Sequence, residues 1–227
     1  MTETLLLAVI LIPCLIIAIV FHEVAHGWTA LALGDPTAKE QRRLSLNPLR
    51  HVDPVGTLLV PGALALVGGP VFGWAKPVPV NARRLDNPRY GMMLVAAAGP
   101  ATNILLAFIG AIGIGVVMGL SGPAMPEWAI TAFTSFILIN AFLAFFNLLP
   151  IPPFDGSHIV GGLLPRSMAA QWQKLQQLGM LMIIVLVAVS WAFPDSGIIE
   201  HVVWPPVQWI VLQFFGLADS VALAIGG

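Results

Sequence analysis

The chain has 227 residues, of which 58% are hydrophobic and only 9% are charged. A soluble domain carries about 25% charged residues, so this composition excludes an ordinary soluble protein and indicates one that crosses a membrane several times. The formal net charge of −1 favours no nucleic-acid partner. The single cysteine, Cys14, excludes an internal disulfide framework.

Five stretches approach or exceed the roughly 20 apolar residues that cross a bilayer. In chain order they are 4–33, 90–120, 128–149, 175–192 and 199–216. The first lacks a basic leader and a small-residue cleavage site, so we expect it to be retained as a span. A sixth apolar stretch, 55–72, is interrupted by prolines and glycines. The pattern predicts an all-α polytopic membrane protein with five to six transmembrane helices.

The interrupted stretch 55–72 decides the predicted topology. If it re-enters rather than crosses, all ten Lys and Arg residues fall on one face, which the positive-inside rule makes cytoplasmic. We therefore predict a re-entrant or membrane-edge segment, which can include short β-strands; a sixth ordinary span is the alternative. Five crossings then place the N-terminus outside and the C-terminus inside. Broken backbone at membrane depth needs protein or water partners, so this segment is a candidate for lining a cavity.

A histidine pair lies near the cytoplasmic end of the first span, where the sequence reads Phe-His-Glu-Val-Ala-His-Gly over residues 21–27. On a helix, His22 and His26 are one turn apart and can bind the same metal ion. Glu23 lies beside them, placed to take a proton from a water that the metal activates. The alternative is a pair of packing histidines with a partnered glutamate. Ionisable residues inside an apolar span are costly and usually functional, which favours the metal site.

A catalytic zinc ion usually has three protein ligands, so a third is needed. Asp155 follows the third span within Asn-Leu-Leu-Pro-Ile-Pro-Pro-Phe-Asp-Gly, residues 147–156. His22 lies roughly 27 Å along the first span, so both motifs fall near the cytoplasmic face. The prolines force a non-helical approach from which a carboxylate can reach a metal. An ordinary turn aspartate before glycine is the alternative, but the histidines at matching depth favour a ligand.

Together these two motifs and Gly-Pro-Ala-Thr-Asn at 99–103 resemble the site-2 protease family of intramembrane zinc metalloproteases. Segments 47–56 and 73–81 resemble its compact prokaryotic branch, whose members often lack PDZ or CBS domains. The zinc motif lies here on the first span, whereas many members have a span before it.

The resemblance implies one zinc ion bound by His22, His26 and Asp155, with Glu23 as general base. It implies a transmembrane protein segment as substrate, unwound before cleavage, in the bilayer of a prokaryotic inner membrane. In this family Asn147 is thought to hold the substrate or polarise the scissile carbonyl. Segment 73–81 is expected to resemble an edge strand that pairs with the substrate.

We expect one integral-membrane metalloprotease domain over residues 1–227, with a catalytic core at about 4–156 and accessory helices at about 157–227. Its function is then regulated intramembrane proteolysis, with the active site toward the cytoplasm. The alternatives are a metal-ion transporter, an inactive relative acting as a binding module, and a membrane protease that cuts soluble substrates. A transporter needs several ligands along a path, and an inactive relative would not need Glu23.

Other polar residues keep two interpretations. Asn103 and Asn140 lie within spans and favour interhelical hydrogen bonds, although Asn103 is also a candidate for substrate or oxyanion binding. His51 and Asp53 belong either to a substrate loop or to a structural loop. His158 either supports the metal site or lies on an ordinary helix surface.

Overall fold

The structure is a computed structural model that describes residues 2–60, 63, 66, 74–192, 197 and 201–226. It divides into two compact units that are interleaved in sequence. The first comprises Met1–Ala18, Ala101–Phe146 and Ile199–Gly227, and the second comprises Ile19–Pro100 and Asn147–Ile198. Helices α1 (Thr2–Ala32) and α4 (Pro88–Ser121) contribute residues to both units.

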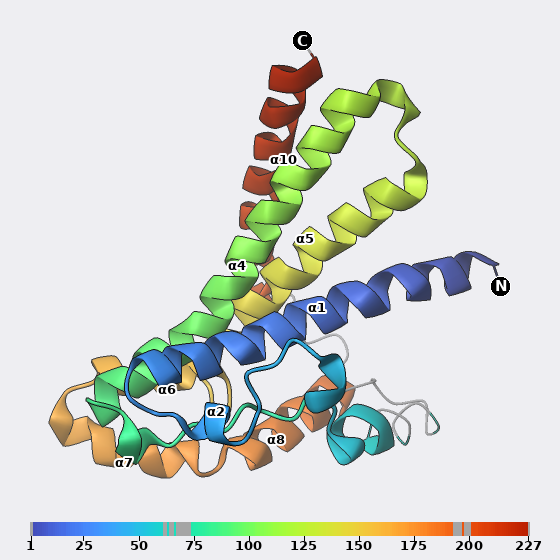
Figure 1. The fold of residues 1–227 in the computed structure, drawn as a ribbon. Coiled ribbons are helices and arrows are strands. Elements are labelled where there is room, and N and C mark those ends of the chain that lie inside the picture. The colour runs from blue at the N-terminus through green and yellow to red at the C-terminus, as the bar shows by residue number, and fades with distance from the viewer. Residues whose placement is uncertain are drawn as a thin grey trace. The chain divides into compact units, whose positions relative to one another are not determined.

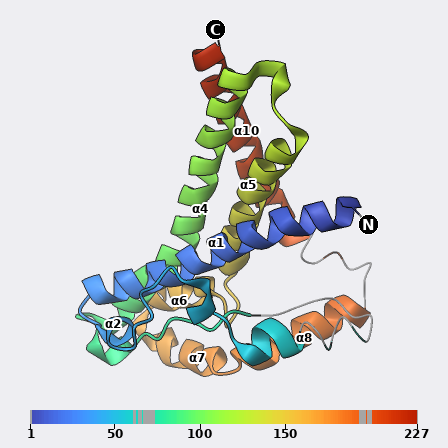
Figure 2. The same ribbon diagram turned by 45° about the vertical axis from the view of Figure 1, so that its right-hand side comes forward.

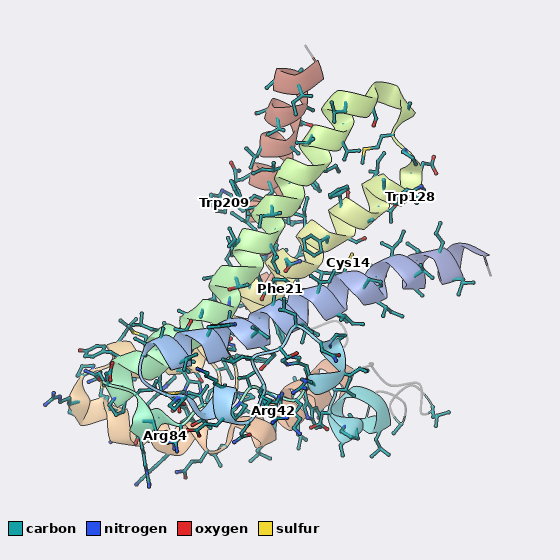
Figure 3. All side chains as sticks on the ribbon, viewed as in Figure 1. Cys14, Phe21, Arg42, Arg84, Trp128 and Trp209 are labelled. Atoms are coloured by element: carbon teal, nitrogen blue, oxygen red, sulfur yellow. The ribbon has the colours of Figure 1, made fainter. Side chains whose placement is uncertain are left out.

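Four helices within the described residues are long and apolar enough to cross a membrane. They are α1, α4, α5 (Glu127–Asn147) and α10 (Trp204–Gly226). Large apolar side chains on these helices are exposed, among them Trp128 and Trp209 (Figure 3). Exposed apolar surface of this kind suits a lipid environment, so the chain is a helical membrane protein. The predicted spans 4–33, 90–120 and 128–149 coincide closely with α1, α4 and α5.

The last two predicted spans differ from the helices that form. The stretch 175–192 is divided by a turn at 177–178 between α7 (Arg166–Gln176) and α8 (Gly179–Ala192). The 14 residues of α8 extend about 21 Å, less than the hydrocarbon thickness of about 30 Å. The stretch 199–216 corresponds to α10, which begins later because Pro205 and Pro206 fit only the first turn of a helix.

The region between α1 and α4 contains short helices and irregular backbone. These helices are α2 (Thr37–Glu40), η1 (Pro48–Arg50), the π-helix η2 (Pro54–Leu59) and η3 (Ala82–Arg84). Residues 74–81 have no regular secondary structure, and the described part of this region contains none of the short β-strands considered above. Most of 61–73 lies outside the described residues. The prediction that 55–72 re-enters the membrane therefore concerns mainly residues that the structure does not describe.

In the first unit, the part of α4 from Ala101 onward and α5 form a hairpin joined through η4 (Gly122–Ala124), and α10 runs beside α4 (Figures 1 and 2). Glycines make the approach of α10 possible. A Cβ atom at Gly115 would lie 2.5 Å from the carbonyl oxygen of Ala218, and one at Gly119 would lie 2.8 Å from that of Ala222. Small residues at helix interfaces let membrane helices pack by close contact.

The second unit positions the candidate site. A buried apolar cluster joins α1, η3 and α4; it is formed by Ala30 of α1, Leu85 directly after η3, and Val95 of α4. Helix α6 (Asp155–Leu163) is tied to α7 because the indole Nε1 of Trp172 donates a 2.7 Å hydrogen bond to the carbonyl oxygen of Ser157. The second unit therefore packs parts of α1, α4 and α6 against each other.

Candidate active site

The structure brings His22, His26 and Asp155 together, as predicted. The two histidines lie one turn apart on α1, and Asp155 is the first residue of α6. The Nε2 atoms of His22 and His26 lie 3.2 and 3.4 Å from Oδ2 of Asp155. One candidate ligand atom from each residue lies within 4.8 Å of the others, so a single metal ion can contact all three.

A main-chain carbonyl orients His26. Its Nδ1 lies 2.7 Å from the carbonyl oxygen of Val95 on α4. Because a carbonyl only accepts, Nδ1 carries the proton and donates, which leaves the Nε2 lone pair facing Asp155. A second hydrogen bond of this kind is the usual support of a metal-binding histidine.

The geometry of these residues fits a metal ion. Oδ2 of Asp155 is buried, and no described residue gives it a hydrogen bond. On α4, Gly99 leaves space beside both rings, because a Cβ atom there would lie 2.5 Å from Cε1 of His22 and 2.6 Å from Nε2 of His26. Two imidazoles and an ionised carboxylate match the ligands of a catalytic zinc ion.

Glu23 is held by the irregular segment 74–81. The amide N–H of Val78 donates a 2.8 Å hydrogen bond to Oε2 of Glu23. This leaves the carboxylate fixed beside the histidines of the same helix. A general base must be held in place, so this hydrogen bond is compatible with the role of Glu23, which stays a prediction.

The approach to Asp155 is non-helical, as the prolines predict: residues 148–154 form turns, and Phe154 precedes α6 with extended backbone. Gly156 permits this turn, because a Cβ atom there would lie 2.2 and 2.4 Å from the carbonyl oxygens of Leu148 and Leu149. The Asp-Gly pair is thus explained by a close backbone approach directly after the candidate ligand.

The two predicted asparagines have different surroundings. Asn147 is the last residue of α5 and belongs to the same unit as the histidines and Asp155. Asn103 belongs to the other unit, where its fully buried Nδ2 donates to the carbonyl oxygen of Ala18 (3.1 Å) and to Oδ1 of Asn140 (2.9 Å). These bonds agree with the interhelical interpretation of Asn103 and Asn140, and substrate binding by Asn103 stays a prediction.

The remaining polar candidates make structural contacts. His51 is 3% exposed and its Nε2 bonds to the carbonyl oxygen of Ser45 (2.8 Å), while Asp53 caps η2 through the amides at 55 and 56. On α6, His158 accepts a 3.3 Å hydrogen bond at Nδ1 from Gln176 of α7 and lines a cavity of about 330 Å³. The structural-loop interpretation therefore fits His51 and Asp53.

Some contributors to the site have little or no signal in the sequence. Val78 and Val95 act through the main chain, so their side chains predict nothing about this role. Gly99 was noticed only as part of a motif. A glycine directly before Pro100, inside a predicted span, is a signal from which a close approach at this position could be inferred.

Comparison with known proteins decides the family. The model of Peptidase family M50 matches residues 112–189, which include Asp155. A Bacillus subtilis (strain 168) protein named "Putative zinc metalloprotease YwhC" is 39% identical over 199 residues, covering 86% of this chain and 84% of that protein. The chain belongs to peptidase family M50. It is thus a metalloprotease of the site-2 protease type, as its motifs predicted.

A second M50 relative agrees with this assignment. "Putative zinc metalloprotease Rip2" of Mycolicibacterium smegmatis (strain ATCC 700084 / mc(2)155) is 30% identical over 207 residues, covering 83% of this M50 peptidase and 74% of the relative. No solved structure matches the chain at a significant level.

Proposed function

We propose that this M50 peptidase hydrolyses peptide bonds within or near transmembrane segments of membrane-protein substrates, using one zinc ion. The observation that carries the proposal is that Asp155 of α6 meets His22 and His26, which flank Glu23 on α1, a helix apolar enough to span the bilayer. Ionisable groups in such a helix are costly unless they serve a function. Regulated proteolysis of single-span proteins is the physiological role that we propose.

In this proposal His22, His26 and Asp155 hold the zinc ion, which when bound supplies Lewis-acid polarisation of the scissile carbonyl and acidifies a water. Glu23 takes the proton of the attacking water and passes it to the leaving amine. Val78 holds Oε2, so we assign the proton transfer to Oε1 of the same carboxylate. Asn147 contacts the substrate.

Segment 74–81 is the proposed site for pairing with an extended substrate. The amides of Trp74, Lys76 and Val78 donate to Gly56, His51 and Glu23 of the chain itself. Pro77 and Pro79, which alternate with them, have no amide hydrogen. The substrate backbone therefore contributes mainly donors, and this segment mainly carbonyl acceptors.

The basic residues support a cytoplasmic orientation of the site. All ten Lys and Arg fall in two regions, one from the end of α1 to the first turn of α4 and the other between α5 and α8. Crossings by α1, α4 and α5 put both regions on one side, and the positive-inside rule makes that side cytoplasmic. The N-terminus is then outside. A cytoplasmic C-terminus additionally requires that the short helix α8 cross the bilayer.

The test compares purified wild type with Glu23→Gln, measuring bound zinc and cleavage of a panel of single-span substrates. We expect about one zinc ion in both proteins and cleavage within the span by wild type alone, with activity lowered at least about 100-fold in the variant. Unchanged activity of Glu23→Gln would remove the general-base role. Zinc binding without cleavage by wild type would favour transport, which zinc flux into liposomes then measures. Folded wild type without zinc would refute the metal site.

A further inference from the structure

Arg43 is a nearly buried cation that contacts the segment holding Glu23. Its residue surface is only 9% exposed. Burying a guanidinium is costly unless its donors are satisfied. The Nη2 atom of Arg43 donates to the carbonyl oxygens of Lys76 (2.8 Å) and Pro77 (3.3 Å). The buried charge is therefore directed at two consecutive carbonyls that immediately precede Val78.

One peptide group connects Arg43 to Glu23. The carbonyl of Pro77 and the amide N–H of Val78 belong to the same planar peptide unit. Arg43 donates to its oxygen, and its N–H donates to Oε2 of Glu23. A cation at the carbonyl end and an anion at the amide end polarise the peptide in the same sense, so each hydrogen bond strengthens the other.

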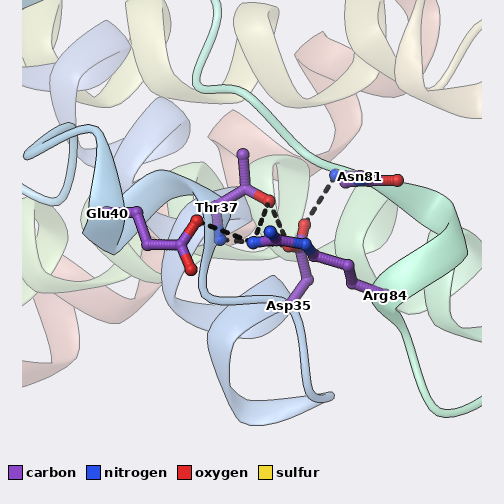
Figure 4. Close-up of polar contacts among 5 residues, drawn as sticks. All are labelled: Asp35, Thr37, Glu40, Asn81 and Arg84. Carbon is purple, nitrogen blue, oxygen red and sulfur yellow. Dashed lines mark hydrogen bonds and ion pairs between the residues drawn. The ribbon is translucent and has the colours of Figure 1, made fainter.

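The surrounding structure fixes this peptide against α1. Gly27, one turn after Glu23, permits the contact, because a Cβ atom there would lie 2.9 Å from Cγ1 of Val78. The amide of Lys76 donates to the carbonyl oxygen of His51 (2.8 Å). At the far end, Asn81 donates its amide to Oδ2 of Asp35 (2.6 Å; Figure 4). The segment is thus held on both sides of Val78.

We propose that Arg43 is a positioning residue that holds the general base Glu23 through the Pro77–Val78 peptide group. The proposal rests on the proposed function, because it takes Glu23 as the base. Arg43 fixes the direction of the Val78 amide, and this amide fixes the Glu23 carboxylate beside the histidines. The residue acts at a distance and contacts neither substrate nor metal.

The first test measures the contact itself and needs no activity. In protein labelled with ¹⁵N-valine, hydrogen exchange of the Val78 amide is followed by NMR, with Val78→Ala used to assign its signal. We expect exchange in Arg43→Met to be at least about 10-fold faster than in wild type. Exposed Arg83 supplies the matched control Arg83→Gln, which should leave this rate unchanged. If the Val78 amide of Arg43→Met exchanges as slowly as in wild type, the proposal is overturned. This outcome does not depend on whether the protein cleaves any substrate.

The second test measures cleavage of a single-span substrate in zinc-loaded protein. For Arg43→Met we expect kcat to fall about 10- to 100-fold, with bound zinc unchanged and Arg43→Lys intermediate, since an ammonium reaches one carbonyl but lacks the planar fork. Val78→Pro removes the amide and should lower kcat similarly with Arg43 intact, whereas Val78→Ala should not. If Arg43→Met does not fold, Arg43→Lys and Val78→Pro carry the test. A normal kcat in both, or a change confined to KM or zinc content, overturns the proposal.

Discussion

The amide of Val78 and the carboxylate of Glu23 are joined by a 2.8 Å hydrogen bond across 55 positions of sequence. The candidate base is therefore held by main chain rather than by a side chain. The same segment is the one proposed to pair with the substrate. A substrate that displaces residues 74–81 would also displace the base, so correct docking and base alignment depend on one another.

Gly99→Ala should prevent normal metal binding. The new methyl group would lie 2.6 Å from Nε2 of His26, so the imidazoles must move apart. Because displacing even the supports of metal ligands costs about 10- to 100-fold in affinity, we expect at least that loss in a zinc titration. The control is Gly216→Ala on α10, where nothing lies within 4 Å and zinc affinity should not change. Wild-type zinc affinity in Gly99→Ala would contradict the observed packing.

Asp35→Asn should destabilise the protein at neutral pH. Asp35 is fully buried and accepts hydrogen bonds from Thr37 and from the amide of Asn81 (Figure 4). An amide nitrogen in place of one oxygen would face a donor, so we expect a loss of about 1.5–3 kcal/mol in the free energy of unfolding. The exposed loop residue Asp86 gives a control, Asp86→Asn, for which stability should be unchanged.

The effect of Asp35 should also depend on pH. Burial raises the pKa of its carboxyl, but hydrogen bonds from Thr37 and Asn81 and the charge of Arg84 outweigh burial and lower the pKa. A lowered folded-state pKa means that the stabilisation is present above the unfolded pKa of about 3.9 and is lost as the pH falls below it. Unfolding measurements at pH 7 and at lower pH should show wild type and Asp35→Asn converging. A difference that stays constant would contradict this.

Asn103→Leu separates the two interpretations of that residue. The substitution removes donors to Ala18 and Asn140, so we expect a stability loss of about 0.6–1.7 kcal/mol with kcat unchanged in the folded fraction. Asn140→Leu should give a similar loss. Normal stability together with a lower kcat in Asn103→Leu would instead favour substrate binding by this asparagine.

Reporter fusions test the topology. A reporter placed after Leu178, before α8, should be cytoplasmic, since Arg166 and Lys174 lie in that region. Five crossings predict that a reporter after Gly226 is cytoplasmic as well. Export of the second reporter alone would mean that α8, with 14 residues, does not cross the bilayer.

The chemistry of the site could be predicted because it depends on residue types at fixed spacing. The one-turn separation of His22 and His26 follows from helix periodicity alone. The prolines before Asp155 predicted its non-helical approach. Hydropathy also placed α1, α4 and α5, since a long apolar run leaves few alternatives.

The support of the site could not be predicted, because it comes from segments without periodicity. Arg43, Asp35 and Glu23 each bind the main chain of segment 74–81 through long-range contacts that no local pattern encodes. Hydropathy alone also misplaces helix ends. Pro205 and Pro206 indicate that α10 begins next to them, at Trp204. The apolar residues before Trp204 extend the hydropathy signal and make the span seem to begin at 199.

The close contact of α4 with α10 has a consequence for biosynthesis. Gly115 and Gly119 leave a face of α4 against which the backbone near Ala218 and Ala222 packs closely. A ribosome makes α4 well before α10, the last helix described. Lipid chains must cover this glycine face while the nascent chain grows, and α10 must then displace them. Assembly of the first unit is therefore completed only after the C-terminal helix has left the translocon.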